Sequence, residues 1–246
     1  MTVFFVGAGP GAADLVTLRA ARLIASCPVI LYAGALVPRE LLDTARPDAR
    51  LVDTATLDLD AITAELVAAH AAGQDVARLH SGDPSVYSAM AEQMRRLDAA
   101  GVPFDVVPGV PAFAAAAASL RRELTVPGVG QTVVLTRTSA RSTPMPAGES
   151  LAAYAATGAT LVLHLAVQRI AELVPELVVH YGPGCPAAVV AYASREDEVI
   201  LRGPLAGIAA QVAEAGVTRT AVVIVGPVLA AEQFPDSHLY STTRPR

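Results

Sequence analysis

Residues 81–87 (SGDPSVY) carry the residue types best suited to holding a small ligand against the backbone. They follow an apolar run, residues 76–79, and precede a helix-compatible run. Gly82 can adopt backbone angles closed to other residues, so main-chain atoms there can approach a ligand. Asp83 is expected to cap the next helix, with Pro84 at its first position. Taken alone, the segment predicts a well-formed helix start as readily as a binding loop.

Other glycine-rich or polar turns accompany this segment, at residues 6–11 (VGAGPG), 107–110 (VPGV) and 193–198 (ASREDE). GAGPGA formally fits a dinucleotide loop, which would make the protein a nicotinamide-dependent oxidoreductase. Pro10, however, lacks the N–H that a pyrophosphate would bind. The second expected strand ends in Tyr32, Ala33 and Gly34, without the acidic residue that holds a ribose. We therefore expect these turns to admit a neutral or cationic ligand.

The elements that position these turns alternate between short apolar runs and amphipathic helical runs, which is typical of α/β architecture. The polar segment 194–197 lies between the expected strands at 187–193 and 198–202, and this predicts a hairpin in the second half. The sequence thus predicts a mostly parallel sheet in a first domain (1–118) and a mixed sheet in a second (119–246), with the ligand in the cleft between them. The expected strands are 3–6, 29–32, 76–80, 104–107, 132–136, 160–165, 187–193, 198–202 and 221–225.

Composition excludes several classes of protein. The chain has 246 residues, of which 53% are apolar, and this is ample for a large core. No apolar run reaches the roughly 18 residues of a membrane helix, and no secretory signal is evident, so we expect a cytoplasmic protein.

Cys27 and Cys185 stand alone, so no metal site is expected. The net charge of −5 argues against nucleic acid as a partner. All 18 basic residues are Arg, which excludes lysine chemistry.

The motifs together resemble the tetrapyrrole methyltransferases that use S-adenosylmethionine, a family with a two-domain α/β fold. The resemblance covers nearly the whole chain and includes GDPSVY, VPGV, LVLHL, ASREDE and VVIVGPV in this order. Within the family, LYAGALV (31–37) and HSGDPSVYSA (80–89) are most similar to the precorrin-4 C(11)-methyltransferases of cobalamin synthesis. Members that act on the cobalt complex, or on another corrin carbon, remain alternatives. The family is typically homodimeric, so a homodimer is expected.

The resemblance implies a set of residues around S-adenosylmethionine, or its product S-adenosylhomocysteine. The donor has no phosphate and needs close backbone atoms and an apolar slot, which small residues at these turns would provide. For the aliphatic members of the set, ordinary core packing is the competing interpretation. The implied cofactor residues are Pro10, Ser81, Gly82, Asp83, Val86, Pro111, Ala112, Leu165, Tyr192 and Ala193.

The proton acceptor is not assigned by the resemblance. Relatives that act on uroporphyrinogen look as if they use an Asp after the second-strand tyrosine, but Ala33 follows Tyr32 here. Tyr32, His164 and Asp83 are candidates by chemistry only, and a strand histidine is more often a hydrogen-bonded core residue.

The substrate implied by the family is a small tetrapyrrole with many carboxylates. We expect Arg137 and Arg141 to pair with some of them, and Arg39 and Arg121 are weaker candidates. Relatives of the same fold that methylate ribosomal RNA or a translation factor, and a non-catalytic binding module, are further alternatives.

Overall fold

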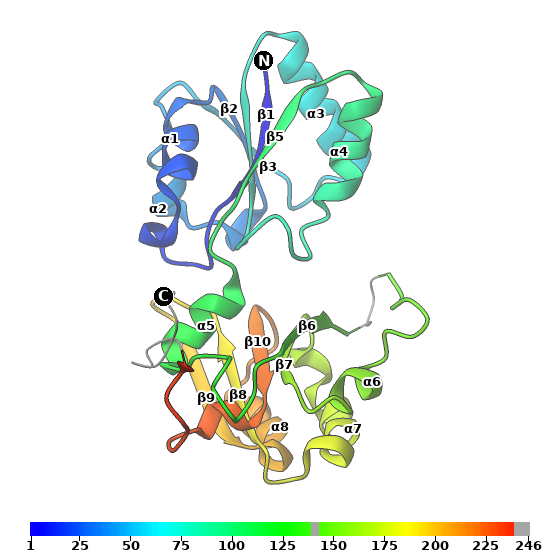
Figure 1. Ribbon diagram of the computed structural model, residues 1–246. Helices are drawn as coiled ribbons and strands as arrows, with labels where there is room; N and C mark the ends of the chain where they lie inside the picture. Colours follow the sequence, from blue (N-terminus) through cyan, green and yellow to red (C-terminus); the bar gives the residue numbers. More distant parts are fainter. Residues whose placement is uncertain (139–142, 239–246) are drawn as a thin grey trace. The chain divides into compact units, whose positions relative to one another are not determined.

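The computed structural model describes residues 1–138 and 143–238. Contacts divide the chain into two compact units, Met1–Ala115 and Ala116–Arg246, and each contains one sheet with its own hydrophobic core (Figure 1). The expected α/β architecture is confirmed. The domain boundary expected after residue 118 stays a prediction about which parts fold independently.

The first unit is built on a 5-stranded sheet in the order β3-β2-β4-β1-β5, in which every pair is parallel. Its parallel strands are nearly continuous apolar runs, as expected for a sheet covered on both faces. Because the strands are parallel, the turns that follow them all lie where the carboxyl ends of the strands meet, and we call this side of the sheet the first-unit edge. The strands are β1 (Val3–Gly7), β2 (Val29–Tyr32), β3 (Arg50–Asp53), β4 (Val76–His80) and β5 (Phe104–Val107).

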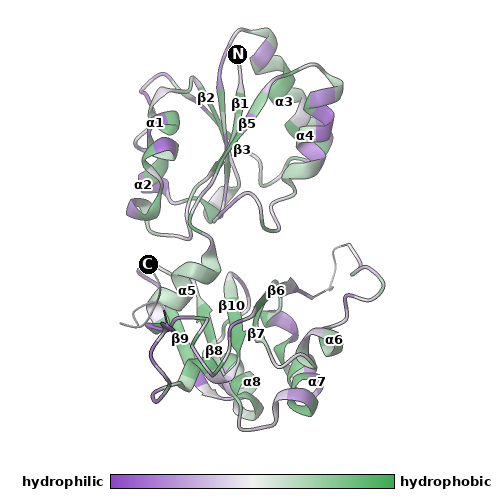
Figure 2. Cartoon of the chain, in the orientation of Figure 1, coloured by the Kyte–Doolittle hydropathy of each residue, from purple (hydrophilic) through white to green (hydrophobic). Residues whose placement is uncertain are grey.

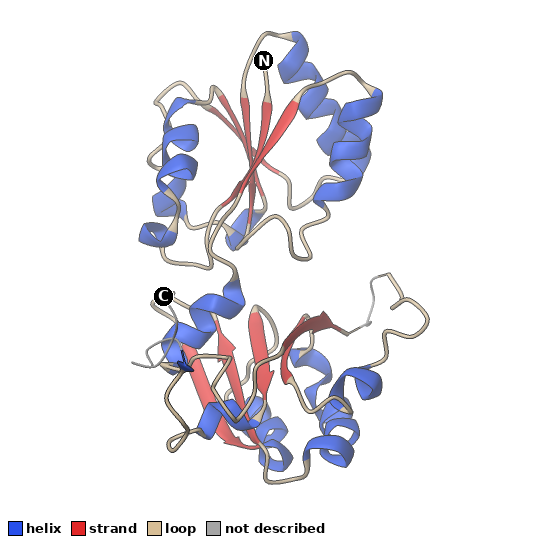
Figure 3. Cartoon of the chain, viewed as in Figure 1, coloured by secondary structure: helices blue, strands red, loops and turns tan. Residues whose placement is uncertain are grey.

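Helices cover the two faces of this sheet separately (Figure 3). Alternate residues of β4 divide between them: Ala77 and Leu79 pack in one apolar cluster, and Val76 packs in the other. The helices are α1 (Leu18–Ser26), α2 (Arg39–Leu42), α3 (Leu59–Ala71) and α4 (Met90–Ala99), with short 3-10 turns η1 (Ala13–Leu15) and η2 (Gly34–Leu36).

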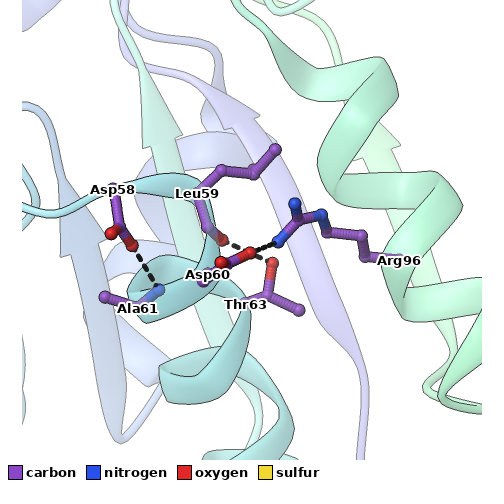
Figure 4. Close-up of polar contacts among 6 residues, drawn as sticks. All are labelled: Asp58, Leu59, Asp60, Ala61, Thr63 and Arg96. Carbon is purple, nitrogen blue, oxygen red and sulfur yellow. Dashed lines mark hydrogen bonds and ion pairs between the residues drawn. The ribbon is translucent and has the colours of Figure 1, made fainter.

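Local polar contacts fix where α3 begins and how it meets α4 (Figure 4). Asp58 caps α3 by accepting a hydrogen bond from the N–H of Ala61 at 2.8 Å. The next acidic residue, Asp60, pairs with Arg96 of α4. The Asp60 side chain is 83% exposed, so its contact with Arg96 lies at the solvent side of the helical layer. Helix α4 is more hydrophilic than the strands of the sheet (Figure 2).

The second unit has a 5-stranded mixed sheet in the order β6-β7-β10-β8-β9. Only β6 and β7 are parallel within it, and β8 and β9 form the predicted antiparallel hairpin. The strands are β6 (Val133–Arg137), β7 (Thr160–His164), β8 (Pro186–Ala191), β9 (Val199–Pro204) and β10 (Ala221–Val225). Its helices are α6 (Leu151–Ala155), α7 (Ile170–Tyr181) and α8 (Leu205–Glu214), with 3-10 turns η3 (Val167–Arg169) and η4 (Pro227–Ala230). Helix α5 (Ala112–Leu120) spans the division between the two units, which falls after Ala115.

The structure differs from the expected elements in instructive places. Strand β3 was not predicted, because an edge strand that carries Arg50, an exposed Leu51 and Asp53 has no apolar alternation. Strand β7 ends one residue early, because Leu165 adopts a left-handed conformation with φ of 54°. Strand β8 ends before Tyr192 for the same reason, with φ of 53°. Among the described helices, none is long and apolar enough to cross a membrane.

Candidate functional site

The turns after β1 and β4 are joined backbone to backbone. The N–H of Gly82 donates to the carbonyl of Gly9 at 2.7 Å, and the N–H of Gly9 donates to the carbonyl of Gly82 at 3.2 Å. One residue earlier, the N–H of Ala8 donates to the carbonyl of His80 at 2.8 Å. Both glycines have positive φ, 75° at Gly9 and 69° at Gly82, which explains why glycine stands there. The motifs singled out in the sequence thus form one surface of main-chain atoms.

The turn after β5 packs against this surface so closely that side chains are excluded. A Cβ atom on Gly109 would lie 2.2 Å from the carbonyl oxygen of Gly82. A Cβ atom on Gly7 would lie 2.5 Å from the Cα of Gly109. Real Cβ contacts are never this short, so the three turns can meet only where glycine stands.

Asp83 ties two of these turns together instead of capping a helix. Its Oδ2 accepts a hydrogen bond from the N–H of Gly109 at 2.7 Å, and its Oδ1 accepts from the N–H of Ser85 at 2.8 Å. The helix-capping prediction is wrong, because α4 begins only at Met90 and its N-cap is Ala89. Partial burial raises the pKa of the Asp83 carboxyl, but hydrogen bonds from Ser85 and Gly109 outweigh it, so the pKa is lowered overall. Asp83 is therefore a carboxylate at neutral pH.

This arrangement disfavours a phosphate ligand. The N–H groups of Gly9, Gly82 and Gly109 are all used within the protein, so these glycines offer a pyrophosphate no donors. The charge of Asp83 would also repel an anion. A ligand without phosphate, and with positive charge, fits better.

The structure brings the first-unit members of the implied cofactor set to this edge. Pro10 is buried beside Gly9, Ser81 is exposed beside Gly82, and Val86 is half-buried in the segment after Asp83. A Cβ built on Gly82 would lie 3.6 Å from both the Cα of Pro111 and the backbone N of Ala112. These residues thus gather at one edge of the sheet, and their contact with S-adenosylmethionine stays a prediction.

The second-unit members of the set lie at one edge of the other sheet. Strands β7 and β8 both run antiparallel to β10, so Leu165 and Tyr192, which follow them, lie at the same edge. Leu165 is 61% exposed, so core packing does not explain it. The N–H of Tyr192 donates to the carbonyl of Thr220 at 2.8 Å, and Ala193 beside it is buried.

The remaining candidates are distributed over both units. Tyr32 is the half-buried last residue of β2, and its carbonyl accepts a hydrogen bond from the N–H of Thr54 at 2.8 Å. His164 ends β7 directly beside Arg137 in the parallel register, and burial lowers the pKa of the His164 imidazole. Nη2 of Arg137 donates to the carbonyl of Thr143 at 2.9 Å. Arg141 lies outside the described residues.

Sequence reasoning missed a buried polar cluster under the first-unit turns. Arg78 is 5% exposed, and its guanidinium donates to Oε1 of Gln93 and to Oγ1 of Thr54, each at 3.1 Å. Burial lowers the pKa of Arg78 to about 10. His80 is also 5% exposed, and its Nε2 has no partner among the residues that the structure describes. Burial together with the charge of Arg78 lowers the pKa of His80 to about 3. The period-two pattern of β4 places both on one face, which is the signal that could have found them.

Among the described residues no cluster of His, Cys, Asp and Glu could hold a metal ion. The weaker arginine candidates are an exposed Arg39 at the start of α2 and Arg121, which directly follows α5 with φ of 53°. Neither is drawn into the contacts described above.

Comparison with known proteins agrees with this geometry. The chain is 66% identical over 246 residues to a protein of Rhodococcus erythropolis named precorrin-4 C(11)-methyltransferase, and the match covers 100% of this chain and 99% of the relative. The solved structure of a cobalamin biosynthetic enzyme, cobalt precorrin-4 methyltransferase, matches with a TM-score of 0.90 and 34% identity, over 93% of this chain and 95% of that one.

A further solved structure is that of uroporphyrin-III C-methyl transferase from Thermus thermophilus complexed with S-adenyl homocysteine. It matches with a TM-score of 0.79 and 30% identity, over 95% of this chain and 96% of that one. The family described as tetrapyrrole (corrin/porphyrin) methylases matches residues 2–209. The chain therefore belongs to the tetrapyrrole (corrin/porphyrin) methylases, a family of methyltransferases.

Proposed function

We propose that this protein transfers a methyl group from S-adenosylmethionine to C-11 of precorrin-4, giving precorrin-5 in cobalamin biosynthesis. The observation that carries the proposal is the 66% identity, over 100% of this chain and 99% of the relative, to the precorrin-4 C(11)-methyltransferase of Rhodococcus erythropolis. The glycine backbone at the first-unit turns supports the proposal independently. It offers a phosphate no N–H donors, which disfavours a dinucleotide and agrees with a donor that has no phosphate.

The residues proposed to hold the donor act mainly by close backbone approach. When bound, S-adenosylmethionine supplies a methyl group already activated on a sulfonium. The negative charge of Asp83 complements a cationic ligand, and the backbone has positive φ at Gly82, Leu165 and Tyr192. The proposed set is Pro10, Ser81, Gly82, Asp83, Val86, Pro111 and Ala112 from the first unit, with Leu165, Tyr192 and Ala193 from the second.

The protein's task is then to orient the ring carbon of the substrate and to exclude water. We propose that Arg137 and Arg141 bind carboxylates of the tetrapyrrole, since a guanidinium forms paired, charge-assisted hydrogen bonds with them. Tyr32 and His164 are candidates for proton transfer by their chemistry only.

The cobalt complex of precorrin-4 is the second candidate substrate, because the solved cobalt precorrin-4 methyltransferase has nearly the same fold. The test is incubation of the purified protein with S-adenosylmethionine and either precorrin-4 or cobalt-precorrin-4, followed by mass spectrometry and NMR of the product. We expect one added methyl group, at C-11, on metal-free precorrin-4. Methylation of the cobalt complex alone, or at another carbon, would contradict the proposal.

The family resemblance also supports a homodimer located in the cytoplasm. Sedimentation equilibrium of the purified protein tests the first part, and a mass of one chain at micromolar concentration would contradict it. Fluorescence of a tagged protein in its own cell tests the second.

A further inference from the structure

Asp53 lies at the first-unit edge and is held there by several hydrogen bonds, but the proposed function has so far given it no role. It ends β3 and lies opposite Tyr32, the last residue of β2, in the parallel register. Its Oδ1 accepts hydrogen bonds from the N–H of Gly34 at 3.0 Å and from the N–H of Ala55 at 2.9 Å. The carboxylate therefore lies against the LYAGALV segment, beside Ala33.

A buried cation holds the strand end that carries this carboxylate. The N–H and the Oγ1 of Thr54, the next residue, both donate to the carbonyl of Tyr32, at 2.8 and 2.9 Å. Oγ1 of Thr54 in turn accepts from Arg78 at 3.1 Å. Among the described residues, Arg78 has no carboxylate within 4.0 Å. Its positive charge therefore has no counterion there, and it contacts Thr54, the residue that follows Asp53 in the sequence.

The other titratable groups of this edge are less suited to accept a proton. Both oxygens of Asp83 already accept hydrogen bonds, from Ser85 and from Gly109. The imidazole of His80 is buried, and the charge of Arg78 disfavours its protonated form. The Asp53 side chain is exposed, and its Oδ2 has no partner in the part of the chain that the structure describes.

We propose that Asp53 is the catalytic proton acceptor of the methyl transfer, an inference that rests on the proposed function. The new C–C bond forms with the π electron pair of an enamine C=C in the macrocycle, and the electron pair of the S–CH₃ bond stays on sulfur. The enamine N–H proton moves to Oδ2 of Asp53, which leaves a C=N bond in the product. Charge and atoms balance with no further reactant.

The test separates the base from the backbone anchor. Asp53→Asn keeps an Oδ1 that can accept from Gly34 and Ala55 but cannot take a proton, whereas Asp53→Ala removes both functions. Asp75→Asn is the matched control, because Oδ1 of Asp75 accepts from the N–H of Thr2 at the opposite edge of the same sheet. Turnover of precorrin-4, calorimetric binding of S-adenosylhomocysteine and the melting temperature are measured for each.

We expect Asp53→Asn and Asp53→Ala both to lower kcat about 10²- to 10⁴-fold, while Asp53→Asn keeps wild-type binding and melting, and Asp75→Asn keeps wild-type kcat. Undiminished kcat in Asp53→Asn, with wild-type turnover present, would overturn the role of Asp53 and leave the proposed function intact. A wild-type protein that leaves precorrin-4 unmethylated would overturn both.

Discussion

Asp83 and Gly109 are joined by a hydrogen bond of 2.7 Å from the Gly109 N–H to the Asp83 Oδ2, and this bond links the turn after β4 to the turn after β5. The two residues are 26 positions apart in the sequence. The same carboxylate also accepts from Ser85, so it determines both the course of its own turn and the position of its neighbour.

Replacing Asp83 by Ala is expected to weaken this edge. The N–H of Gly109 would lose a charged acceptor, which costs about 1.5–3 kcal/mol in unfolding free energy. Binding of S-adenosylmethionine should weaken at least about 10-fold, because a fixed negative charge that complements its sulfonium is lost. Denaturant unfolding and calorimetry measure the two effects. Asp98→Ala, on the exposed end of α4, is the control, and equal losses in both variants would contradict the role of Asp83.

A methyl group at position 109 is expected to disrupt the site more than the fold elsewhere. Gly109→Ala would place a Cβ 2.2 Å from the Gly82 carbonyl, so the turns must separate. We expect a loss of about 1–3 kcal/mol in stability and no measurable binding of S-adenosylhomocysteine. The matched control is Gly184→Ala, where an added Cβ meets nothing within 4 Å. Normal binding by Gly109→Ala would show that the turns can move apart without consequence.

The buried His80 makes stability depend on pH. Its pKa is lowered to about 3 in the folded state, from an ordinary value near 6.5, because burial and Arg78 disfavour the charged form. The unfolded chain binds more protons between these values, so stability falls as pH decreases from about 6.5 toward 3. The expected loss is about 1.4 kcal/mol per pH unit, or about 2 kcal/mol between pH 6.5 and pH 5.

Urea unfolding of the wild type and of His80→Phe, at several pH values, measures this contribution. The variant cannot titrate at this position and should lose less stability on acidification. His70→Phe, at the C-terminal end of α3, removes a different histidine and serves as control. If His80→Phe and the wild type lose stability in parallel, another group causes the pH dependence.

Arg137 is expected to affect the substrate and not the donor. A guanidinium–carboxylate pair contributes about 1.5–3 kcal/mol, so Arg137→Ala should raise KM for precorrin-4 about 10- to 150-fold. The KM for S-adenosylmethionine should change little. Arg50→Ala, at the start of β3, is the control, because Arg50 pairs with Glu65 at the opposite edge from the first-unit turns. Equal effects on both KM values would remove Arg137 from the substrate site.

Hydrophobic period and turn residues sufficed to predict most of the fold. Strands β4 and β5 were predicted with the bounds they have, because each is a short run between polar or Gly/Pro residues. Strand β3 escaped prediction, since its stability comes from pairing with β2 and not from burial of its own side chains. The hairpin was predictable because its turn is polar and short.

The site was less predictable than the fold. Gly82 and Gly109 are separated in the sequence. No local pattern indicates that the backbone of Gly82 leaves no room for a side chain at position 109. The expected helix-capping by Asp83 was wrong for the same reason, because its partner Gly109 lies on another turn. Arg78 was overlooked because a charged residue inside an apolar run is read as an interruption, whereas here Gln93 and Thr54 accept its hydrogen bonds.

The crowding of main-chain atoms around Gly7, Gly82 and Gly109 limits which substitutions these turns can accept. Any side chain at position 7 or 109 would force the turns apart, so a single substitution there is expected to cost both stability and binding. Open sites such as Gly73, where an added Cβ meets nothing within 4 Å, impose no comparable packing barrier. New specificities in this scaffold must therefore arise from the side chains that surround the crowded backbone, with the backbone itself inherited unchanged.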